Sequence, residues 1–172
     1  MPTPKADRPH MPGYGIAEAS GGKGLLPWSW ALERLNDAHN YFVATARPDG
    51  RPHVMPVWGV WLDDVFYFST ATTSRKARNL AANAHCVVTT ERADESVIVE
   101  GVAEEVTDEA VLRRFVEVYH EKYDWKIDTS GGGIYAVRPR VAFGFIEAAE
   151  NFGKTATRWR FEAVQSAPEA TP

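Results

Sequence analysis

The chain has 172 residues, of which 44% are hydrophobic and 24% charged, and its net charge is −4. These values are ordinary for one globular domain with a sizeable core, and they exclude the basic footprint of a nucleic-acid-binding protein. No apolar run reaches the roughly 20 residues of a membrane span, and the first residues lack the apolar core expected of a secretory signal. Cys86 is the single cysteine, so no disulfide can form within the chain, and we expect a cytoplasmic protein.

The first half of the chain predicts one helix and three strands. Residues 1–24 are rich in proline and glycine, which predicts a flexible or surface-draped tail. Pro27 and Ser29 suit the start of a helix that runs to about His39. Tight turns then separate three predicted strands of an antiparallel meander, over residues 40–46, 52–62 and 65–69.

The second half predicts strands with helices inserted between them. The predicted helices span residues 74–83 and 108–123, and the predicted strands span residues 85–91, 97–106, 134–138 and 141–147, the last two separated by Pro139. Residues 162–172 are polar and predicted to be disordered. Consecutive strands with inserted helices favour an α+β fold, mainly β, with one antiparallel barrel-like domain over residues 25–161.

The most informative segment joins the strand at residues 65–69 to the helix at residues 74–83. Five of the six residues from Ser69 to Ser74 carry hydroxyls, and Arg75 and Lys76 follow directly. A helix N-terminus offers free N–H groups and the positive end of the helix dipole. Cations are unfavourable beside this positive end unless a bound anion compensates their charge. The pattern therefore predicts a phosphate site; the alternative is a capped helix with a solvated basic face.

Two other segments allow a ligand-binding or a purely structural interpretation. Pro56 makes the strand at residues 52–62 an edge or a bulge, which either frees backbone groups for a ligand or simply ends the sheet. His53 on this strand is either an ordinary strand histidine or a ligand contact. Arg158 and Trp159 either clamp a planar ligand or belong to a terminal strand with a packed tryptophan. The five scattered histidines predict no metal site.

Several short motifs occur in an order and spacing that resemble the split β-barrel flavin and deazaflavin oxidoreductases, the superfamily that includes pyridoxamine 5′-phosphate oxidase. Over residues 30–148 these motifs are Thr45-x-x-x-Asp49-Gly50-x-Pro52-His53, Pro56-Val57-Trp58, Phe66-Tyr67-Phe68-Ser69-Thr70, Ser74-Arg75-Lys76-x-x-Asn79-Leu80 and Val99-Glu100-Gly101. Tyr119 and Lys122-Tyr123 resemble the later helix of the family. The terminal Thr157–Phe161 segment resembles the actinobacterial subgroup that uses the deazaflavin coenzyme F-420.

This resemblance implies an FMN-binding type of split barrel and an obligate homodimer with cofactor sites at its interface. It places the cofactor phosphate on the segment that begins at Ser74. It places the cofactor ring along the predicted strands at residues 52–62 and 65–69. The implied cofactor-binding residues are His53, Val54, Met55, Pro56, Val57, Trp58, Phe68, Ser69, Thr70, Ser74, Arg75, Lys76, Asn79, Arg158 and Trp159.

Departures from the family pattern refine the expected activity. The pyridoxamine phosphate oxidases carry cations near the positions of His53 and Trp58 and end in an Arg-x-His motif, and this chain has neither feature. Trp58 and Trp61 are instead expected to line an aromatic pocket for a planar substrate. The expected function is an F-420-dependent reductase that transfers a hydride from reduced deazaflavin to a planar conjugated small molecule. The alternatives are an FMN-dependent oxidoreductase and a non-catalytic module that binds flavin or haem.

Overall fold

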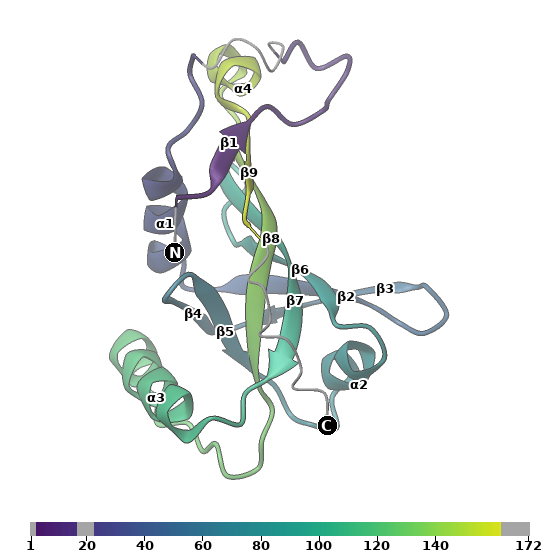
Figure 1. Ribbon diagram of the computed structural model, residues 1–172, viewed down its shortest axis with the longest axis vertical. Coiled ribbons are helices and arrows are strands. Elements are labelled where there is room, and N and C mark those ends of the chain that lie inside the picture. Colours follow the sequence, from purple (N-terminus) through teal and green to yellow (C-terminus); the bar gives the residue numbers. More distant parts are fainter. Residues whose placement is uncertain (1–2, 17–22, 163–172) are drawn as a thin grey trace, which may run out of the picture.

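The computed structural model describes residues 3–16 and 23–162. A long, twisted antiparallel sheet forms the body of the molecule, and helices lie at its margins (Figure 1). The helices are α1 (Trp28–Asp37), α2 (Arg75–Ala82), α3 (Glu109–Tyr123) and α4 (Ala149–Thr155). The strands are β1 (Lys5–Asp7), β2 (Tyr41–Ala46), β3 (Pro52–Val57), β4 (Gly59–Leu62), β5 (Val65–Ser69), β6 (His85–Thr90), β7 (Glu95–Glu105), β8 (Ile134–Ile146) and β9 (Thr157–Arg160).

The sheet contains nine strands in the order β1-β9-β8-β7-β6-β2-β3, while β5 pairs with β8 and β4 pairs with β5. Every pairing is antiparallel, and the sheet does not close on itself. The expected fold, a mainly β split barrel with flanking helices, is confirmed. Strand β3 is a free edge, as Pro56 predicted, because a residue without an N–H group is tolerated there.

The predicted strand over residues 52–62 is two strands that belong to different parts of the sheet. Strand β3 pairs with β2, whereas β4 pairs with β5, and the strand structure is interrupted between β3 and β4 at Trp58. Gly59 allows this break, because a Cβ atom there would lie 2.3 Å from the Phe66 ring. Both pairings of the predicted meander are present, but its middle strand is divided into β3 and β4, and β5 also pairs with β8.

Pro139 does not end a strand as predicted. Strand β8 runs continuously past it, and the register with β7 shifts between Glu100 and Gly101, which lie opposite Val141 and Pro139. One extra residue on β8 is thus absorbed in a β-bulge, and a bulge tolerates the missing N–H group of proline. The predicted division into two strands is wrong for this physical reason.

The N-terminal segment also departs from expectation. Strand β1 pairs with β9, and the Asp7 carboxylate bonds the Arg158 guanidinium at 2.7 and 3.0 Å. The prediction of a flexible tail over residues 1–24 is therefore wrong for residues 5–7. The predicted disordered tail lies almost wholly outside the described residues. Helix α4, between β8 and β9, was not predicted.

The core has two parts. The larger part lies within the sheet and includes the tryptophans of α1, β4 and β9; Trp28 makes edge contacts with Trp61 and Trp159 at 6.0 and 5.3 Å. The smaller part lies under α3 and is built on Phe115 and Tyr119. Trp61 is thus a core residue, and the expected aromatic pocket that combined it with Trp58 is wrong. In the described part of the chain, no helix is long and apolar enough to cross a membrane.

Candidate functional site

The start of α2 is held by hydroxyl groups from the preceding loop. Ser74 is the N-cap, and its Oγ accepts a hydrogen bond from the Ala77 N–H at 3.1 Å. The Thr70 hydroxyl donates in turn to Ser74 Oγ at 3.0 Å. These contacts fix the entry to the helix, so the remaining N–H groups of its first turn point out of the N-terminus in a defined geometry.

Strands β2 and β3 form the wall beside this helix. Thr45 of β2 lies opposite His53 of β3, and Asn79 of α2 donates to Thr45 Oγ1 at 2.9 Å. Asn79 is fully buried. The amide of Asn79 therefore ties α2 to the sheet, and the first turn of the helix comes to lie beside His53.

Four positive or titratable side chains gather at this junction. Burial lowers the pKa of His53, and repulsion from Arg47, Lys76 and Arg75 lowers it further. Burial also lowers the pKa of Lys76. A histidine whose charged form is disfavoured by three nearby cations lies in a region of positive potential. Such a region is suited to an anion.

The cations of this cluster differ from most arginines of the protein in their pairing. Arg34, Arg51, Arg92, Arg114, Arg138, Arg158 and Arg160 each form an ion pair with a carboxylate. Within residues 3–16 and 23–162, no ion pair involves Arg47, Arg75 or Lys76. The charge of the cluster is therefore available to a ligand.

Buried polar atoms at the same junction also lack partners. Arg47 Nε, His53 Nδ1 and Asn79 Oδ1 are all buried without a hydrogen bond in the described structure. A buried donor without a partner costs about 1–3 kcal/mol, so Arg47 Nε and a protonated His53 Nδ1 indicate a partner that accepts hydrogen bonds. A phosphate fits these two nitrogens and the Lys76 ammonium group, because it offers several acceptor oxygens, whereas Asn79 Oδ1 is itself an acceptor and is not completed by them. We call Arg47, His53, Ser74, Lys76 and Asn79 the cradle.

The other residues of β3 alternate between the two faces of the sheet. Met55 and Val57 lie opposite Val43 and Tyr41 on the face of the cradle, whereas Val54 and Pro56 lie on the other face. Trp58 follows at the strand break with its side chain 38% exposed. Of the predicted ring-binding residues, His53, Met55 and Trp58 are therefore the ones with accessible side chains near the cradle face.

The predicted residues of β5 and β9 take different positions. Phe68 is fully buried, and its ring stacks on Tyr135 at 5.5 Å. Ser69 is the last residue of β5, and Thr70 is the first residue of the loop over residues 70–74, which we call the hydroxyl loop. Trp159 is 1% exposed in the core, and Arg158 is paired with Asp7. Strand β9 lies near the upper end of the molecule in Figure 1, whereas α2 lies near the lower end, so Arg158 and Trp159 do not join the cradle.

The glycine run at residues 131–133 is attached to the hydroxyl loop. Thr70 N–H donates to the Gly133 carbonyl at 2.9 Å, and Gly133 N–H donates to Glu105 Oε1 at 2.8 Å. Gly133 has a φ of +81°, and a Cβ atom there would lie 2.1 Å from the Thr70 carbonyl oxygen. Gly133 and Glu105 thus support the cap of α2 through Thr70.

Sequence reasoning missed Arg47 and Thr45 as members of the site. Arg47 was interpreted only as part of the turn after β2. Arg47 differs from Arg51, the other arginine of this turn, in its pairing. Asp49 forms an ion pair with Arg51 and not with Arg47. Thr45 could be identified only from the register of β2 with β3, which places it opposite His53.

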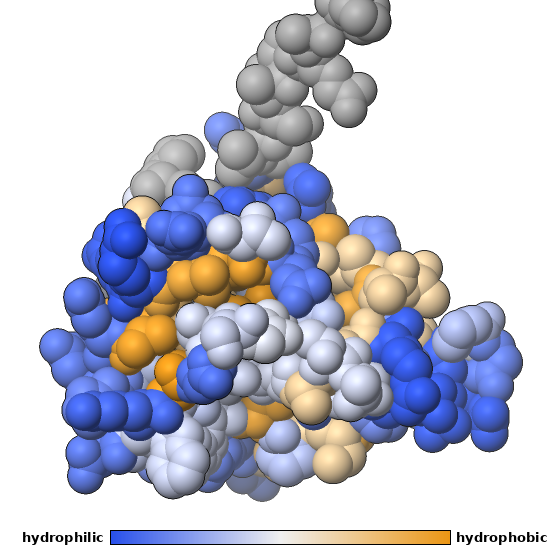
Figure 2. Space-filling model, turned by 90° about the horizontal axis from the view of Figure 1, so that it is seen from below, coloured by the Kyte–Doolittle hydropathy of each residue, from blue (hydrophilic) through white to orange (hydrophobic). Residues whose placement is uncertain are grey.

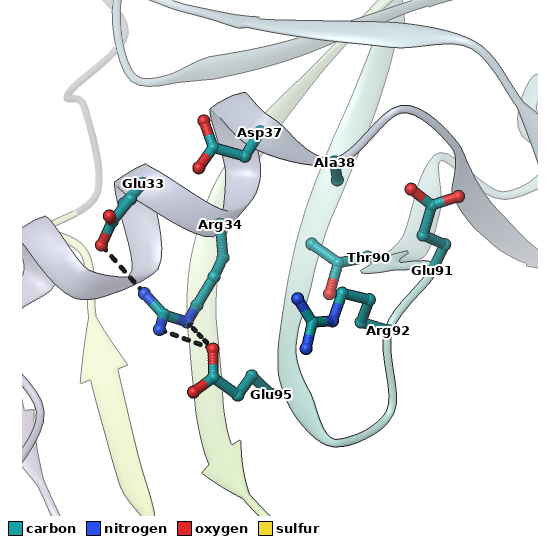
Figure 3. A pocket seen from close by; sticks show the side chains of 8 residues that line it. All are labelled: Glu33, Arg34, Asp37, Ala38, Thr90, Glu91, Arg92 and Glu95. Carbon is teal, nitrogen blue, oxygen red and sulfur yellow. Dashed lines mark hydrogen bonds and ion pairs between the residues drawn. The ribbon is translucent and has the colours of Figure 1, made fainter.

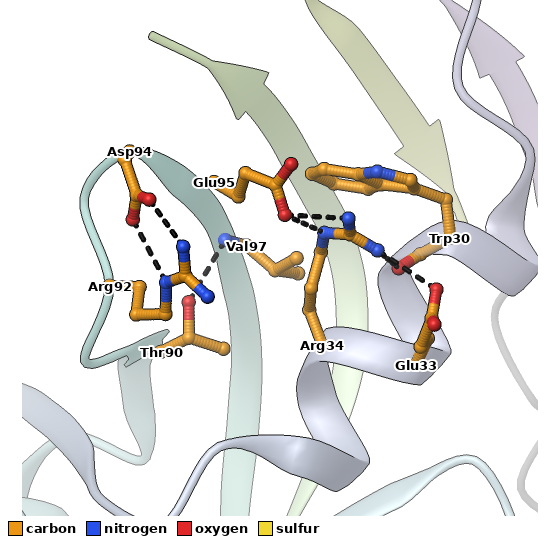
Figure 4. A network of polar contacts seen from close by, with 8 residues as sticks. All are labelled: Trp30, Glu33, Arg34, Thr90, Arg92, Asp94, Glu95 and Val97. Carbon is orange, nitrogen blue, oxygen red and sulfur yellow. Dashed lines mark hydrogen bonds and ion pairs between the residues drawn. The ribbon is translucent and has the colours of Figure 1, made fainter.

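A separate pocket of about 310 Å³ lies between the end of α1 and the β6–β7 turn (Figure 3). In the adjoining network, Arg34 donates to Glu95 at 2.6 and 3.0 Å and to Glu33 at 3.0 Å, and its guanidinium lies 3.9 Å from the centre of the Trp30 ring (Figure 4). Arg92 pairs with Asp94 in the turn itself. Because these guanidinium groups are already paired, the network joins α1 to the hairpin and offers no charge comparable to that of the cradle.

Comparison with known proteins agrees with the fold. Residues 31–162 match the family model described as pyridoxamine 5′-phosphate oxidase. No curated protein matches the sequence. Conserved hypothetical protein Rv2991 from Mycobacterium tuberculosis has a similar structure, with 20% identity and a TM-score of 0.66 over 76% of this chain and 91% of its own.

Two further structures carry descriptions that name a cofactor. A structure described as an F-420 reductase is 25% identical, with a TM-score of 0.54 over 64% of this chain and 93% of its own. A FAD-binding protein from Mesorhizobium loti is 20% identical, with a TM-score of 0.57 over 80% of this chain and 96% of its own. The likeness to the second of these concerns the fold alone.

Proposed function

Because the chain belongs to the pyridoxamine 5′-phosphate oxidase family, we propose that it is an F-420-dependent reductase that transfers a hydride from reduced deazaflavin to a planar conjugated small molecule. The observation that carries the proposal is the cradle, in which unpaired cations and buried polar atoms without partners surround the start of α2. The 25% identity to a structure described as an F-420 reductase supports the choice of cofactor.

The cofactor phosphate binds at the cradle, with Lys76 and Arg47 as charged donors and Ser74 as the cap that orients the helix terminus. When bound, the reduced deazaflavin supplies a hydride. Met55 and Trp58, which are 45% and 38% exposed, would hold and orient the ring beside β3. The apolar character of this face suits a planar conjugated substrate.

A flavin is the second candidate cofactor, because the resemblance to the split β-barrel oxidoreductases implies an FMN-binding type of barrel as well. His53 bears on this choice, because flavin-type oxidases of the resembling superfamily carry cations around the positions of His53 and Trp58. Here cations disfavour the charged form of His53, and Trp58 is neutral. These two residues are the reason for ranking the deazaflavin first.

The cofactor assignment is tested by direct titration. The protein, purified from a host that lacks deazaflavin, is titrated separately with coenzyme F-420 and with FMN while absorbance and fluorescence are monitored. We expect tight binding of F-420 and weak or no binding of FMN. Tight FMN binding with no measurable F-420 binding would reverse the cofactor assignment and leave the cradle in place.

We also propose that the protein is a homodimer with its cofactor sites at the interface. Phe42, Val54, Met55 and Trp58, on or next to the edge pair β2–β3, are 38%, 57%, 45% and 38% exposed. Further apolar surface is visible on the face of the molecule in Figure 2. Large exposed apolar side chains near one sheet edge are typical of an interface. We expect light scattering at micromolar concentration to give the dimer mass, and a monomer mass would contradict the proposal.

A further inference from the structure

The end of α3 is bonded to the strand break between β3 and β4. The Tyr123 hydroxyl accepts a hydrogen bond from the Gly59 N–H at 2.9 Å and lies 2.8 and 2.9 Å from the carbonyl oxygens of Gly59 and His39. A tyrosine hydroxyl has one proton, so it donates to one of these two carbonyls at a time. One side chain thus holds two segments of the chain that are far from it in sequence.

The ring of Tyr123 also covers one face of Trp58. The two rings are parallel within 4°, with their centres 4.7 Å apart. The His39 ring contacts both of them edge-on, at 5.2 Å from Tyr123 and 6.0 Å from Trp58. Because Tyr123 covers one face of the indole, the 38% of Trp58 that is exposed lies away from Tyr123.

Lys122, the residue before Tyr123, also contacts the strand break at Gly59. Its Nζ donates to the Tyr41 hydroxyl at 2.7 Å and to the Gly59 carbonyl at 3.3 Å, and the Tyr41 hydroxyl donates to the Leu35 carbonyl. Burial lowers the pKa of Lys122 to about 8. In the described part of the chain this ammonium group forms no ion pair, so its contacts are with tyrosine and backbone groups. The break at Gly59 is therefore held by two consecutive residues of α3.

Trp58 lies beyond the end of β3, and the cradle residue His53 lies near its start. Trp58 directly follows Val57, the last residue of β3, and His53 is the second residue of that strand. Met55, between them in sequence, shares a face of β3 with His53 and is 45% exposed. An exposed apolar side chain thus separates the cradle from Trp58.

We propose that Tyr123 is a positioning residue that sets the pose of Trp58, and that the open face of Trp58 stacks on a planar conjugated ring. The inference rests on the proposed function. The ring belongs either to the cofactor or to a planar substrate, and both sources present the same chemistry to the indole.

The pose of Trp58 can be measured without any ligand. In ¹H–¹⁵N spectra, the indole signal of Trp58 is identified by its loss in Trp58→Phe. We expect Tyr123→Phe, which removes only the hydroxyl, to shift this signal. Tyr119→Phe is the matched control, because Tyr119 is on the same helix, 6.4 Å from Trp58, and makes no hydrogen bond through its hydroxyl in the described structure. An unchanged Trp58 signal in Tyr123→Phe would overturn the positioning role.

The stacking role is tested with planar rings that lack phosphate. Riboflavin represents the cofactor ring and menadione represents a quinone substrate. A shift of the Trp58 indole signal on adding riboflavin assigns the face to the cofactor, and a shift on adding menadione alone assigns it to the substrate. If neither compound shifts the signal, the stacking role is wrong, whatever the result at the cradle.

Variant affinities for the compound that shifts the signal separate positioning from general stability. We expect Trp58→Leu to weaken binding by about tenfold and Tyr123→Phe by about threefold. In the Trp58→Leu background, Tyr123→Phe should have no further effect, because its action passes through the indole. Additive losses would contradict the inference. Arg78→Ala, at an exposed residue of α2 outside the cradle, should leave riboflavin and menadione binding unchanged. Because neither compound carries a phosphate, failure at the cradle and failure at Trp58 are distinguishable.

Discussion

Replacing Lys76 with alanine is expected to weaken cofactor binding by roughly tenfold to hundredfold. Lys76 is half-buried beside His53, and burial already lowers its pKa, so its charge is incompletely solvated in the free protein. A charge-assisted contact with a phosphate contributes about 1.5–3 kcal/mol, and each 1.4 kcal/mol corresponds to a factor of about ten. The measurement is the dissociation constant of the cofactor for the wild type and for Lys76→Ala, each checked for folding by its thermal melt.

The matched control for this experiment is Arg78→Ala. Arg78 carries the same charge on the same helix but is exposed, and no shift of the His53 pKa is attributed to it. We expect its loss to change the affinity much less than the loss of Lys76. Equal losses in the two variants would indicate that only the overall charge of α2 matters, and an unchanged affinity in a folded Lys76→Ala would remove the phosphate from this site.

Local rules were sufficient to predict the helix start. The hydroxyl run predicted that Ser74 caps α2, and the structure places its Oγ on the Ala77 N–H. The unusual cations at an N-terminus predicted an anion, since that preference depends only on the helix dipole and on neighbours in sequence. The predicted helix over residues 108–123 likewise begins at a local cap, because the Asp108 carboxylate accepts from the Ala110 and Val111 N–H groups. Signals of this kind are contained within one turn of helix.

Features that depend on distant segments could not be predicted in this way. Pro139 signals a strand end locally, but the shifted register of β7 lets β8 continue. Trp61 and Trp58 are three residues apart and equally aromatic; the strand break at Gly59 puts one in the core and leaves the other exposed. The role of Gly133 depends on its contact with Thr70, more than sixty positions earlier in the chain. Long-range register, which one sequence does not encode locally, decides each case.

Replacing Gly133 with alanine is expected to lower both stability and cofactor affinity. The backbone at this residue has a φ of +81°, which costs a residue with a side chain about 1–2 kcal/mol, and the new Cβ atom would lie 2.1 Å from the Thr70 carbonyl oxygen. Because that neighbour is backbone, the hydroxyl loop must move. We expect the free energy of unfolding to fall by about 2–4 kcal/mol and the melting temperature by roughly 5–15 °C.

The loss of affinity should exceed what instability alone produces, because Thr70 donates to the Ser74 cap at 3.0 Å and its displacement disturbs the start of α2. Gly131→Ala is the control: it makes the same substitution in the same glycine run, where a Cβ atom would meet nothing within 4 Å. This variant should melt and bind cofactor like the wild type. If Gly133→Ala also matches the wild type in both measurements, the glycine run is independent of the hydroxyl loop, and the support of the cradle must come from β2 and β3 alone.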